Sequence, residues 1–318
     1  MNLQQLIEQY LTFQGTLGRR FDCLAEILRP FGSALGPGAD IGAVTAEYVK
    51  EFLTKGRPIT STFFIKYQAL RGFYRYAQSR GYTDAAPLPV VLPKRPERVR
   101  PYIYSRDEVR RLLAAVDSLQ EGYRGYRRLE SIALRTIVLL LYGSGLRVSE
   151  ALALNRQDVD SERSLITVRA GKFFRSRLVP VGKDLTGVLS GYARRAVACP
   201  LRPDTGAPFF TDLRGSRVQY PTVLCRFRKA RDQAGIRRRT PDRFQPRLHD
   251  LRHTFAVDRL TAWYREGADV QALLPHLSVY LGHVRLAATQ VYLSMTPELL
   301  QAASGRFERY AFAEERHD

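Results

Sequence analysis

The sequence predicts a mainly α-helical protein that contains one small antiparallel β-sheet and is divided into two domains. Apolar residues recur at helical spacing along most of the chain. Residues with high strand propensity gather in two short runs, 165–168 and 177–181. At 318 residues, the chain is long enough for two separate cores. We expect a helical domain at 1–86, a linker rich in Pro and Arg at 87–102, and a second domain at 103–318.

The first domain is expected to be helical as far as residue 82. Gly and Pro residues separate four segments with apolar residues at helical spacing, and Asp40 or Thr45 could cap the third helix. These segments span residues 3–13, 21–28, 44–53 and 59–82. Basic side chains around the third and fourth helices predict a DNA-facing surface, with a solvated polar face as the alternative. The candidate DNA-binding residues here are Lys55, Arg57, Lys66, Arg71 and Arg75.

The linker alternates prolines with basic residues, among them Lys94 and Arg95. Proline at this density prevents regular structure and keeps the chain extended. We therefore expect a basic connection that lies along a nucleic acid.

The second domain opens with a helix, because Ser105 is followed by acidic residues that suit a first turn. Residues 132–142 are apolar on nearly all sides, which predicts a buried central helix ending in a glycine-rich turn. Arg147 follows this turn and should be partly buried, so its guanidinium needs a partner. That partner could be Glu150 or a phosphate, and the two can act together.

The two strand-forming runs predict a β-hairpin, whose tip at 170–176 carries Lys172 and Arg175. A lysine at such a tip can reach into a DNA groove or can simply be solvated. Helices are expected at 185–197 and 218–234, with a short strand at 208–211 between them.

The strongly basic composition predicts a polyanionic partner. The net charge is +19 and the pI is about 10.2, which favours nucleic acid over an anionic membrane. The alternative is a basic protein from an arginine-rich proteome. Residues 226–247 form the densest basic tract and predict a phosphate-contacting surface, with a localisation signal or a solvated loop as the alternative. Its candidate DNA-binding residues are Arg228, Lys229, Arg237, Arg238, Arg239 and Arg243.

The three cysteines are scattered and lack metal-ligand spacing, so neither a disulfide framework nor a zinc site is expected. This cysteine usage fits a reducing cytoplasm. The N-terminal residues lack the features of a secretory signal, and no apolar run approaches the roughly 18 residues that span a membrane. We expect a cytoplasmic protein without membrane contact.

The most informative stretch runs from His249 to Tyr292. His249 and Arg252 are three residues apart and should share one helix face. His283 follows a glycine, and Tyr292 lies nine residues further on. Imidazoles, a guanidinium and a phenol together suit the attack of an oxygen nucleophile on a phosphodiester, because they can move a proton, neutralise phosphoryl charge and accept the phosphate covalently.

These motifs together resemble those of the tyrosine recombinases, the phage integrase family. Residues 145–150 resemble the first arginine box of that family, and Lys172 stands where the family has its catalytic lysine. Residues 249–253 resemble the second box, while residues 281–283 and Tyr292 resemble the third box and the nucleophile. The resemblance implies a SAM-like helical core-binding domain and a mixed α/β catalytic domain, which form a C-shaped clamp on DNA.

The resemblance also implies roles for the individual residues. Tyr292 would form a 3′-phosphotyrosyl link. Arg147, which Glu150 can orient, and Arg252 would donate hydrogen bonds to the phosphate. Lys172 would protonate the departing 5′-oxygen, His249 would assist proton movement, and His283 would hydrogen-bond the phosphate. Neither a metal nor a cofactor is expected, because the two arginines would supply the charge that magnesium supplies elsewhere.

The implied partners are double-stranded recombination sites and three further copies of the chain, held together by a last helix beyond Tyr292. A related recombinase or an accessory factor is a further candidate. A bacterial, nucleoid-associated enzyme that integrates, excises or transposes a mobile element is the favoured role, ahead of a dimer-resolving recombinase. A type IB topoisomerase and a DNA-binding protein with an inactive site are the alternatives, and the second is disfavoured because every catalytic position is occupied.

Two departures from the family pattern stand out. Phe173, Phe174 and Arg175 follow Lys172, where family hairpins often carry a glycine and a second lysine. The stretch from Arg252 to His283 is longer than in compact family members and predicts an enlarged helix pair.

Overall fold

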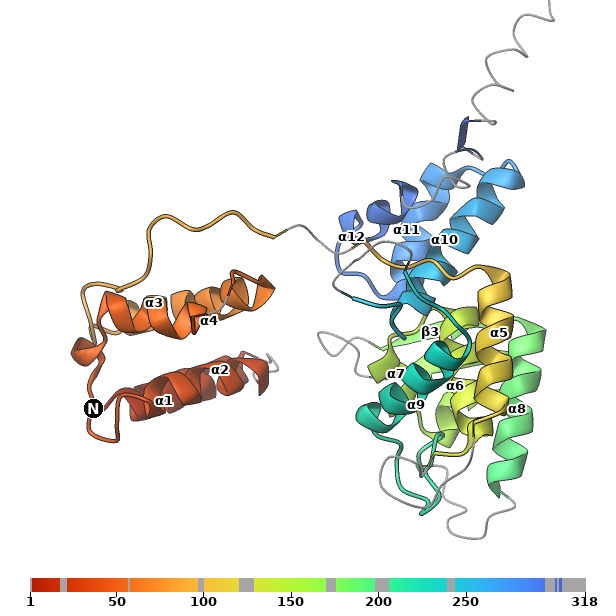
Figure 1. Ribbon diagram of the computed structural model, residues 1–318, viewed down its shortest axis with the longest axis horizontal. Coiled ribbons are helices and arrows are strands. Elements are labelled where there is room, and N and C mark those ends of the chain that lie inside the picture. The colour runs from red at the N-terminus through yellow and green to blue at the C-terminus, as the bar shows by residue number, and fades with distance from the viewer. Residues whose placement is uncertain are drawn as a thin grey trace, which may run out of the picture. The chain divides into compact units, whose positions relative to one another are not determined.

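The computed structural model divides the chain into two compact units, residues 1–98 and 99–318 (Figure 1). It describes residues 2–17, 22–56, 58–96, 100–119, 129–169, 176–197, 206–238 and 244–294, together with 301, 303 and 304. Lys172, Arg175, Arg57, Arg239 and Arg243 lie outside the described residues, as does nearly all of the expected last helix.

The first unit is built from four α-helices. They are α1 (Leu3–Thr16), α2 (Asp22–Ser33), α3 (Ala46–Thr54) and α4 (Ser61–Ser79), with a 3-10 turn at Ile41–Ala43. The Thr45 hydroxyl accepts a hydrogen bond from the Tyr48 backbone N–H at 3.2 Å and so caps α3, whereas Asp40 caps the 3-10 turn. Leu28, Phe31, Leu70 and Phe73 are completely buried in the core that these helices enclose.

The proline-rich stretch is attached to the first unit. Leu88 and Leu92 pack against its core. The Arg95 guanidinium lies 4.9 Å from the centre of the Phe64 ring, at a distance that suits a cation–π contact. These contacts continue the first unit through part of the stretch that the sequence alone describes as an extended linker.

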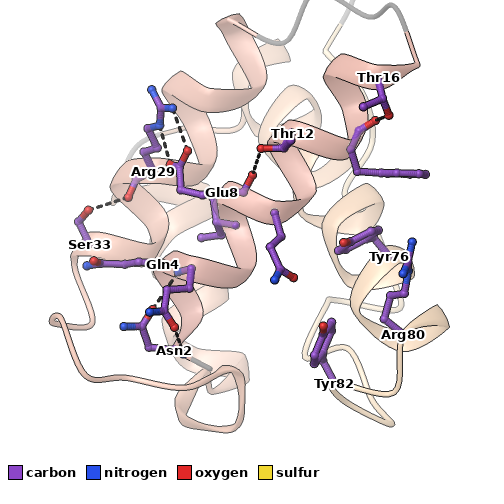
Figure 2. A pocket seen from close by; sticks show the side chains of 14 residues that line it. Asn2, Gln4, Glu8, Thr12, Thr16, Arg29, Ser33, Tyr76, Arg80 and Tyr82 are labelled. Carbon is purple, nitrogen blue, oxygen red and sulfur yellow. Dashed lines mark hydrogen bonds and ion pairs between the residues drawn. The ribbon is translucent and has the colours of Figure 1, made fainter.

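The first unit contains a groove of about 1120 Å³ that is lined by α1, α2 and α4 (Figure 2). Its charges are largely satisfied internally. Arg29 donates two hydrogen bonds to the Glu8 carboxylate, at 2.8 and 3.0 Å, and the Arg80 guanidinium lies over the ring of Tyr76. The described candidates for DNA binding in this unit lie outside the lining of this groove: Lys55, Lys66, Arg71, Arg75, Lys94 and Arg95.

A buried hydroxyl gives a stability prediction for the first unit. Among the described residues, the Tyr74 hydroxyl is buried without a hydrogen-bond partner. Because an unsatisfied buried hydroxyl costs free energy, we expect Tyr74→Phe to raise the free energy of unfolding by about 1 kcal/mol in a urea titration. Tyr48→Phe is the matched control, since the Tyr48 hydroxyl donates to the Phe31 carbonyl at 2.5 Å, and it should lower stability by about the same amount. Equal effects of the two changes would contradict the prediction.

The second unit surrounds a central helix with further helices and one small sheet. The helices are α5 (Arg106–Asp117), α6 (Ser131–Ser144), α7 (Val148–Ala153), α8 (Lys183–Val197), α9 (Tyr220–Gln233), α10 (Asp250–Arg265), α11 (Val270–Leu281) and α12 (Ala287–Gln290), with 3-10 turns at Arg156–Asp158 and Val291–Ser294. The strands are β1 (Val159–Asp160), β2 (Leu165–Val168) and β3 (Arg177–Pro180), antiparallel in the order β1-β2-β3.

The central helix is α6, as its apolar sequence predicts. Leu134, Ile137, Val138 and Leu140 are completely buried, and the helix packs against α5, α8, α9 and α10. The mainly helical fold with a small antiparallel sheet is therefore confirmed. The strand expected at 208–211 is wrong in detail, because this segment forms isolated bridges from Pro208 to Asn155 and from Thr211 to Arg217.

The enlarged stretch before His283 forms the antiparallel pair α10 and α11, which extends to one side of the second unit (Figure 1). Asp269 caps α11 by accepting hydrogen bonds from two backbone N–H groups. Leu260, Leu274 and Leu277 form a small core between the two helices, and Tyr292 packs into the same cluster. The added length thus supports the segment that carries Tyr292.

No helix among the described residues is both long enough and apolar enough to span a lipid bilayer.

Candidate active site

The ends of three helices bring the chemically informative residues of the second unit together. Arg147 is the N-cap residue of α7, directly after the turn that ends α6. His249 is the N-cap residue of α10, and Arg252 lies in its first turn. His283 follows the end of α11, and Tyr292 lies in the 3-10 turn after α12.

Two glycines allow these helix ends to approach closely. Gly145 ends α6 with φ +61°, and a Cβ at this position would lie 2.5 Å from a ring carbon of Phe255. Gly282 ends α11 with φ +66°, and a Cβ there would lie 2.9 Å from the guanidinium carbon of Arg177. Glycine adopts this left-handed conformation without steric cost. Any other residue would push the arginines and their supporting helices apart.

Arg252 joins the two glycine-containing turns. Its side chain is buried, and its Nη1 and Nη2 groups donate hydrogen bonds to the carbonyls of Gly145 and Leu281, each at 2.6 Å. Burial, reinforced by the charge of Arg147, lowers the pKa of Arg252 to about 10. The guanidinium therefore stays charged at neutral pH, and it is held in one orientation by both carbonyls.

Arg147 is held by a three-residue charge cluster. The Glu150 carboxylate accepts hydrogen bonds from the Arg147 guanidinium at 2.7 Å and from the Arg177 guanidinium at 2.9 and 3.0 Å. Arg147 also donates to the Gly282 carbonyl at 2.7 Å. Burial alone would raise the pKa of Glu150, but the hydrogen bonds from the two arginines outweigh it and lower the pKa to about 2.

The Tyr292 side chain is buried between two histidines. Its hydroxyl lies 3.1 Å from Nδ1 of His253, and its ring stacks on that of His283 with centres 6.2 Å apart. Nδ1 of His283 is hydrogen-bonded to the Thr289 hydroxyl at 2.7 Å. Burial raises the pKa of Tyr292, and the nearby charge of Arg252 opposes part of that increase.

A layer of hydrogen bonds behind the site fixes the start of α10. Asp250 is completely buried, and its carboxylate accepts hydrogen bonds from the backbone N–H and the guanidinium of Arg247. The Thr254 hydroxyl donates to the Asp250 carbonyl and accepts from the Tyr104 backbone N–H. These bonds hold the first turn, which carries His249 and Arg252, against the rest of the unit.

The sequence alone did not identify several residues of the site. Arg177 enters from β3, and no local spacing connects it to Glu150. Thr289 and Asp250 support the site through hydrogen bonds that depend on the fold. His253 was visible one helical turn after His249, and that spacing alone could have indicated a second histidine at the site.

The described residues of the expected DNA-binding set fall into two groups. Most of them are exposed on the surface: Lys55, Arg71, Arg75, Lys94, Arg95, Arg228, Lys229 and Arg237. The other two are partly buried and donate hydrogen bonds to backbone carbonyls. Lys66 donates to the Phe52 carbonyl at 2.6 Å, and Arg238 donates to the Arg100 carbonyl at 2.6 Å.

The histidines beside Tyr292 predict a pH dependence of stability. Burial and nearby positive charges lower the pKa of both His253 and His283 from 6.5 to about 4. As the pH falls below 6.5, the unfolded chain binds protons that the folded chain does not, so stability is lost until about pH 4. Solvent screens part of the charge on His283. We therefore expect the free energy of unfolding to fall by about 3 kcal/mol, which is less than the two pKa shifts would give without screening.

Urea titrations between pH 7.5 and 5 would measure this slope before most carboxylates titrate. The double variant His253→Gln/His283→Gln should show a flatter slope over the same range. Identical slopes for the variant and the unchanged protein would contradict the assignment to these histidines.

The sequence matches a known protein family along most of its length. Residues 104–298 match the model of the phage integrase family. The chain is 34% identical over 309 residues to y4rB of Sinorhizobium fredii, named as an integrase/recombinase, covering 96% of this chain and 97% of y4rB. It is 31% identical over 304 residues to the tyrosine recombinase XerA of Thermococcus onnurineus, covering 95% and 94% of the two chains.

Two solved structures show a similar fold. The Tn1549 transposon integrase in complex with transposon right end DNA superposes with a TM-score of 0.66 at 16% identity, covering 98% of this chain and 100% of that one. A lambda integrase tetramer bound to a Holliday junction gives a TM-score of 0.64 at 16% identity, with coverages of 92% and 77%. Because the family model spans more than half of the residues and both relatives match almost throughout, this chain belongs to the phage integrase family and is a tyrosine site-specific recombinase that breaks and rejoins DNA.

Proposed function

We propose that this recombinase cuts DNA by attack of the Tyr292 phenolic oxygen on a phosphodiester, with Arg147 and Arg252 on either side of that phosphate. The observation that carries the proposal is the convergence of the Tyr292 hydroxyl with the two guanidiniums of Arg147 and Arg252, both of which backbone carbonyls hold in place. The product of the attack is a 3′-phosphotyrosyl link and a free 5′-hydroxyl. The link conserves the energy of the phosphodiester, so rejoining requires no separate energy source.

The two arginines would stabilise the charge that builds on the non-bridging oxygens. Each guanidinium donates hydrogen bonds from some of its five N–H groups to protein acceptors, and these bonds hold it in place. The remaining N–H groups can be directed at the phosphate without reorganisation during the reaction. In this scheme the arginines supply the positive charge that a metal ion supplies in other phosphoryl-transfer enzymes.

The remaining family positions receive complementary roles in the proposal. Lys172 would protonate the departing 5′-oxygen, and His249, at the exposed edge of the site, would assist proton movement near the phosphate. The Thr289 hydroxyl can donate to Nδ1 of His283, and in that tautomer the ring carries its proton on Nε2. That N–H could then donate to the phosphate.

The proposed substrate is a pair of double-stranded recombination sites at the ends of a mobile element, bound by four copies of the chain. Two comparisons support this. Homologous structures include an integrase on transposon end DNA and an integrase tetramer on a Holliday junction. The net charge of +19 also favours binding to a polyanion, and the exposed basic residues of both units are the proposed phosphate contacts. The helix beyond Tyr292 is the proposed contact between copies.

The proposal can be tested with two substrates, a nicked suicide duplex that carries the element's ends and a supercoiled plasmid. A covalent adduct on the duplex, together with recombination that requires paired sites, is the expected result. Relaxation of any plasmid regardless of sequence would instead indicate a type IB topoisomerase. Binding without an adduct would overturn the proposal.

A further inference from the structure

The Tyr292 hydroxyl has a hydrogen-bond partner, His253, that has no part in the proposed mechanism. Nδ1 of His253 lies 3.1 Å from the hydroxyl oxygen, and the two ring centres are 5.6 Å apart. His253 lies on α10 one turn after His249, and the two imidazoles meet edge to face with centres 4.9 Å apart. His253 is the more enclosed of the two, since His249 is exposed.

The surroundings of the hydroxyl determine where its proton can go. The charge and hydrogen bond of Arg252 oppose part of the rise in the Tyr292 pKa that burial causes, and an arginine has only donors. The hydroxyl can therefore accept from Arg252 but must donate elsewhere. Nδ1 of His253 lies at hydrogen-bond distance and can accept this proton when the ring carries its own proton on Nε2.

Resting on the proposed function of Tyr292, we propose that His253 is the general base that takes the hydroxyl proton as Tyr292 attacks the DNA phosphate. In this step the Tyr292 oxygen forms a bond to phosphorus while its proton moves to Nδ1 of His253. The bond from phosphorus to the 5′-oxygen breaks, and that oxygen takes a proton from the acid for which Lys172 is the candidate. Rejoining reverses each transfer, so His253 returns its proton to the departing tyrosine.

The protonation state of His253 suits this role. Burial and the neighbouring positive charges lower its pKa to about 4, so the imidazole is neutral at physiological pH and its ring nitrogen can accept a proton. A bound phosphate adds negative charge beside the ring and favours the protonated form. The imidazole thus becomes a better acceptor when the substrate is in place.

A pair of substrates distinguishes this base from the acid of the reaction. One is the nicked suicide duplex, and the other is the same duplex with sulfur in place of the bridging 5′-oxygen, because a thiolate leaves without being protonated. Single-turnover rates of adduct formation are measured for the unchanged protein, His253→Ala, His253→Gln and Lys172→Ala. Thermal unfolding and DNA affinity of each variant are measured alongside.

We expect both His253 variants to form the adduct 10²–10³-fold more slowly on both substrates, since a positioned base contributes roughly 10²–10⁴-fold. Lys172→Ala should be slow only on the oxygen substrate. Added imidazole should restore part of the rate of His253→Ala. Glutamine can hold the hydroxyl but cannot take its proton, so it should not restore the rate.

Three results would overturn the inference. They are a rate within threefold of normal for both His253 variants, a normal rate for His253→Gln alone, and a His253 defect that disappears with the sulfur substrate. The first would show that His253 is dispensable, the second that it only positions the tyrosine, and the third that it acts on the leaving group. Absence of an adduct with the unchanged protein would instead refute the proposed function itself, and the inference would fall with it.

Discussion

Replacing Tyr292 with phenylalanine is expected to abolish the covalent protein–DNA adduct while leaving DNA binding intact. The change removes only the proposed nucleophile. The aromatic ring can remain in its cluster between α10 and α11, stacked on His283. The lost hydrogen bond to His253 should cost about 1 kcal/mol of stability, which is too little to unfold the second unit. Denaturing gel electrophoresis of the protein with a labelled suicide duplex would measure the adduct.

Tyr280→Phe is the matched control for this experiment. The Tyr280 ring stacks on Phe255, and its hydroxyl donates to the Pro180 carbonyl at 3.1 Å, so the control also deletes one hydrogen-bonded hydroxyl from the second unit. It should leave adduct formation within severalfold of normal. An adduct that persists in Tyr292→Phe would show that another group attacks the phosphate.

The parts of this protein that could be predicted from sequence depend on short-range patterns. Ser105 and Glu108 are three residues apart and form the reciprocal cap of α5 that such spacing indicates. The apolar run of α6 predicts its burial in the same way. The pair formed by Arg147 and Glu150 was also foreseeable, because one helical turn brings the two side chains together.

The remaining features depend on contacts between distant segments. Arg177 appeared in the sequence only as the first residue of a strand, yet it donates twice to Glu150 and once to the Tyr280 carbonyl. Lys66 was indistinguishable from its exposed basic neighbours, although its ammonium lies on the Phe52 carbonyl and ring. Charge and local spacing identify basic residues, but only the fold determines which of them are engaged internally.

These contacts explain how a site with a strong positive charge can be stable before DNA binds. Arg147, Arg177 and Arg252 converge near the ends of α6 and α11, where their mutual repulsion would oppose folding. Glu150 supplies the negative charge between two of them, and backbone carbonyls at the helix ends satisfy the third. We therefore expect Glu150 to contribute more to the free energy of unfolding than one partner of an exposed ion pair does.

Replacing Glu150 with alanine is accordingly expected to lower the free energy of unfolding of the second unit by about 3–5 kcal/mol, the usual cost of leaving buried charges without their partner. The Glu150 side chain is 7% exposed, and that of Arg177 is 13% exposed. Asp107→Asn is the matched control, because it removes one partner of the ion pair with Arg110, whose side chains are largely exposed. The control should cost less than about 1 kcal/mol in the same urea titration.

The pH dependence of stability provides an independent measurement of the same cluster. The pKa of Glu150 is about 2 in the folded protein, against 4.5 ordinarily, so its contribution is fully present above pH 4.5 and is lost as the pH falls towards 2. The shift corresponds to about 3 kcal/mol. Glu150→Gln removes this titration, so its stability should converge with that of the unchanged protein at low pH. If the difference in unfolding free energy between the two proteins stays constant from pH 5 to pH 2, the shape of the Glu150 side chain, and not its charge, accounts for its effect.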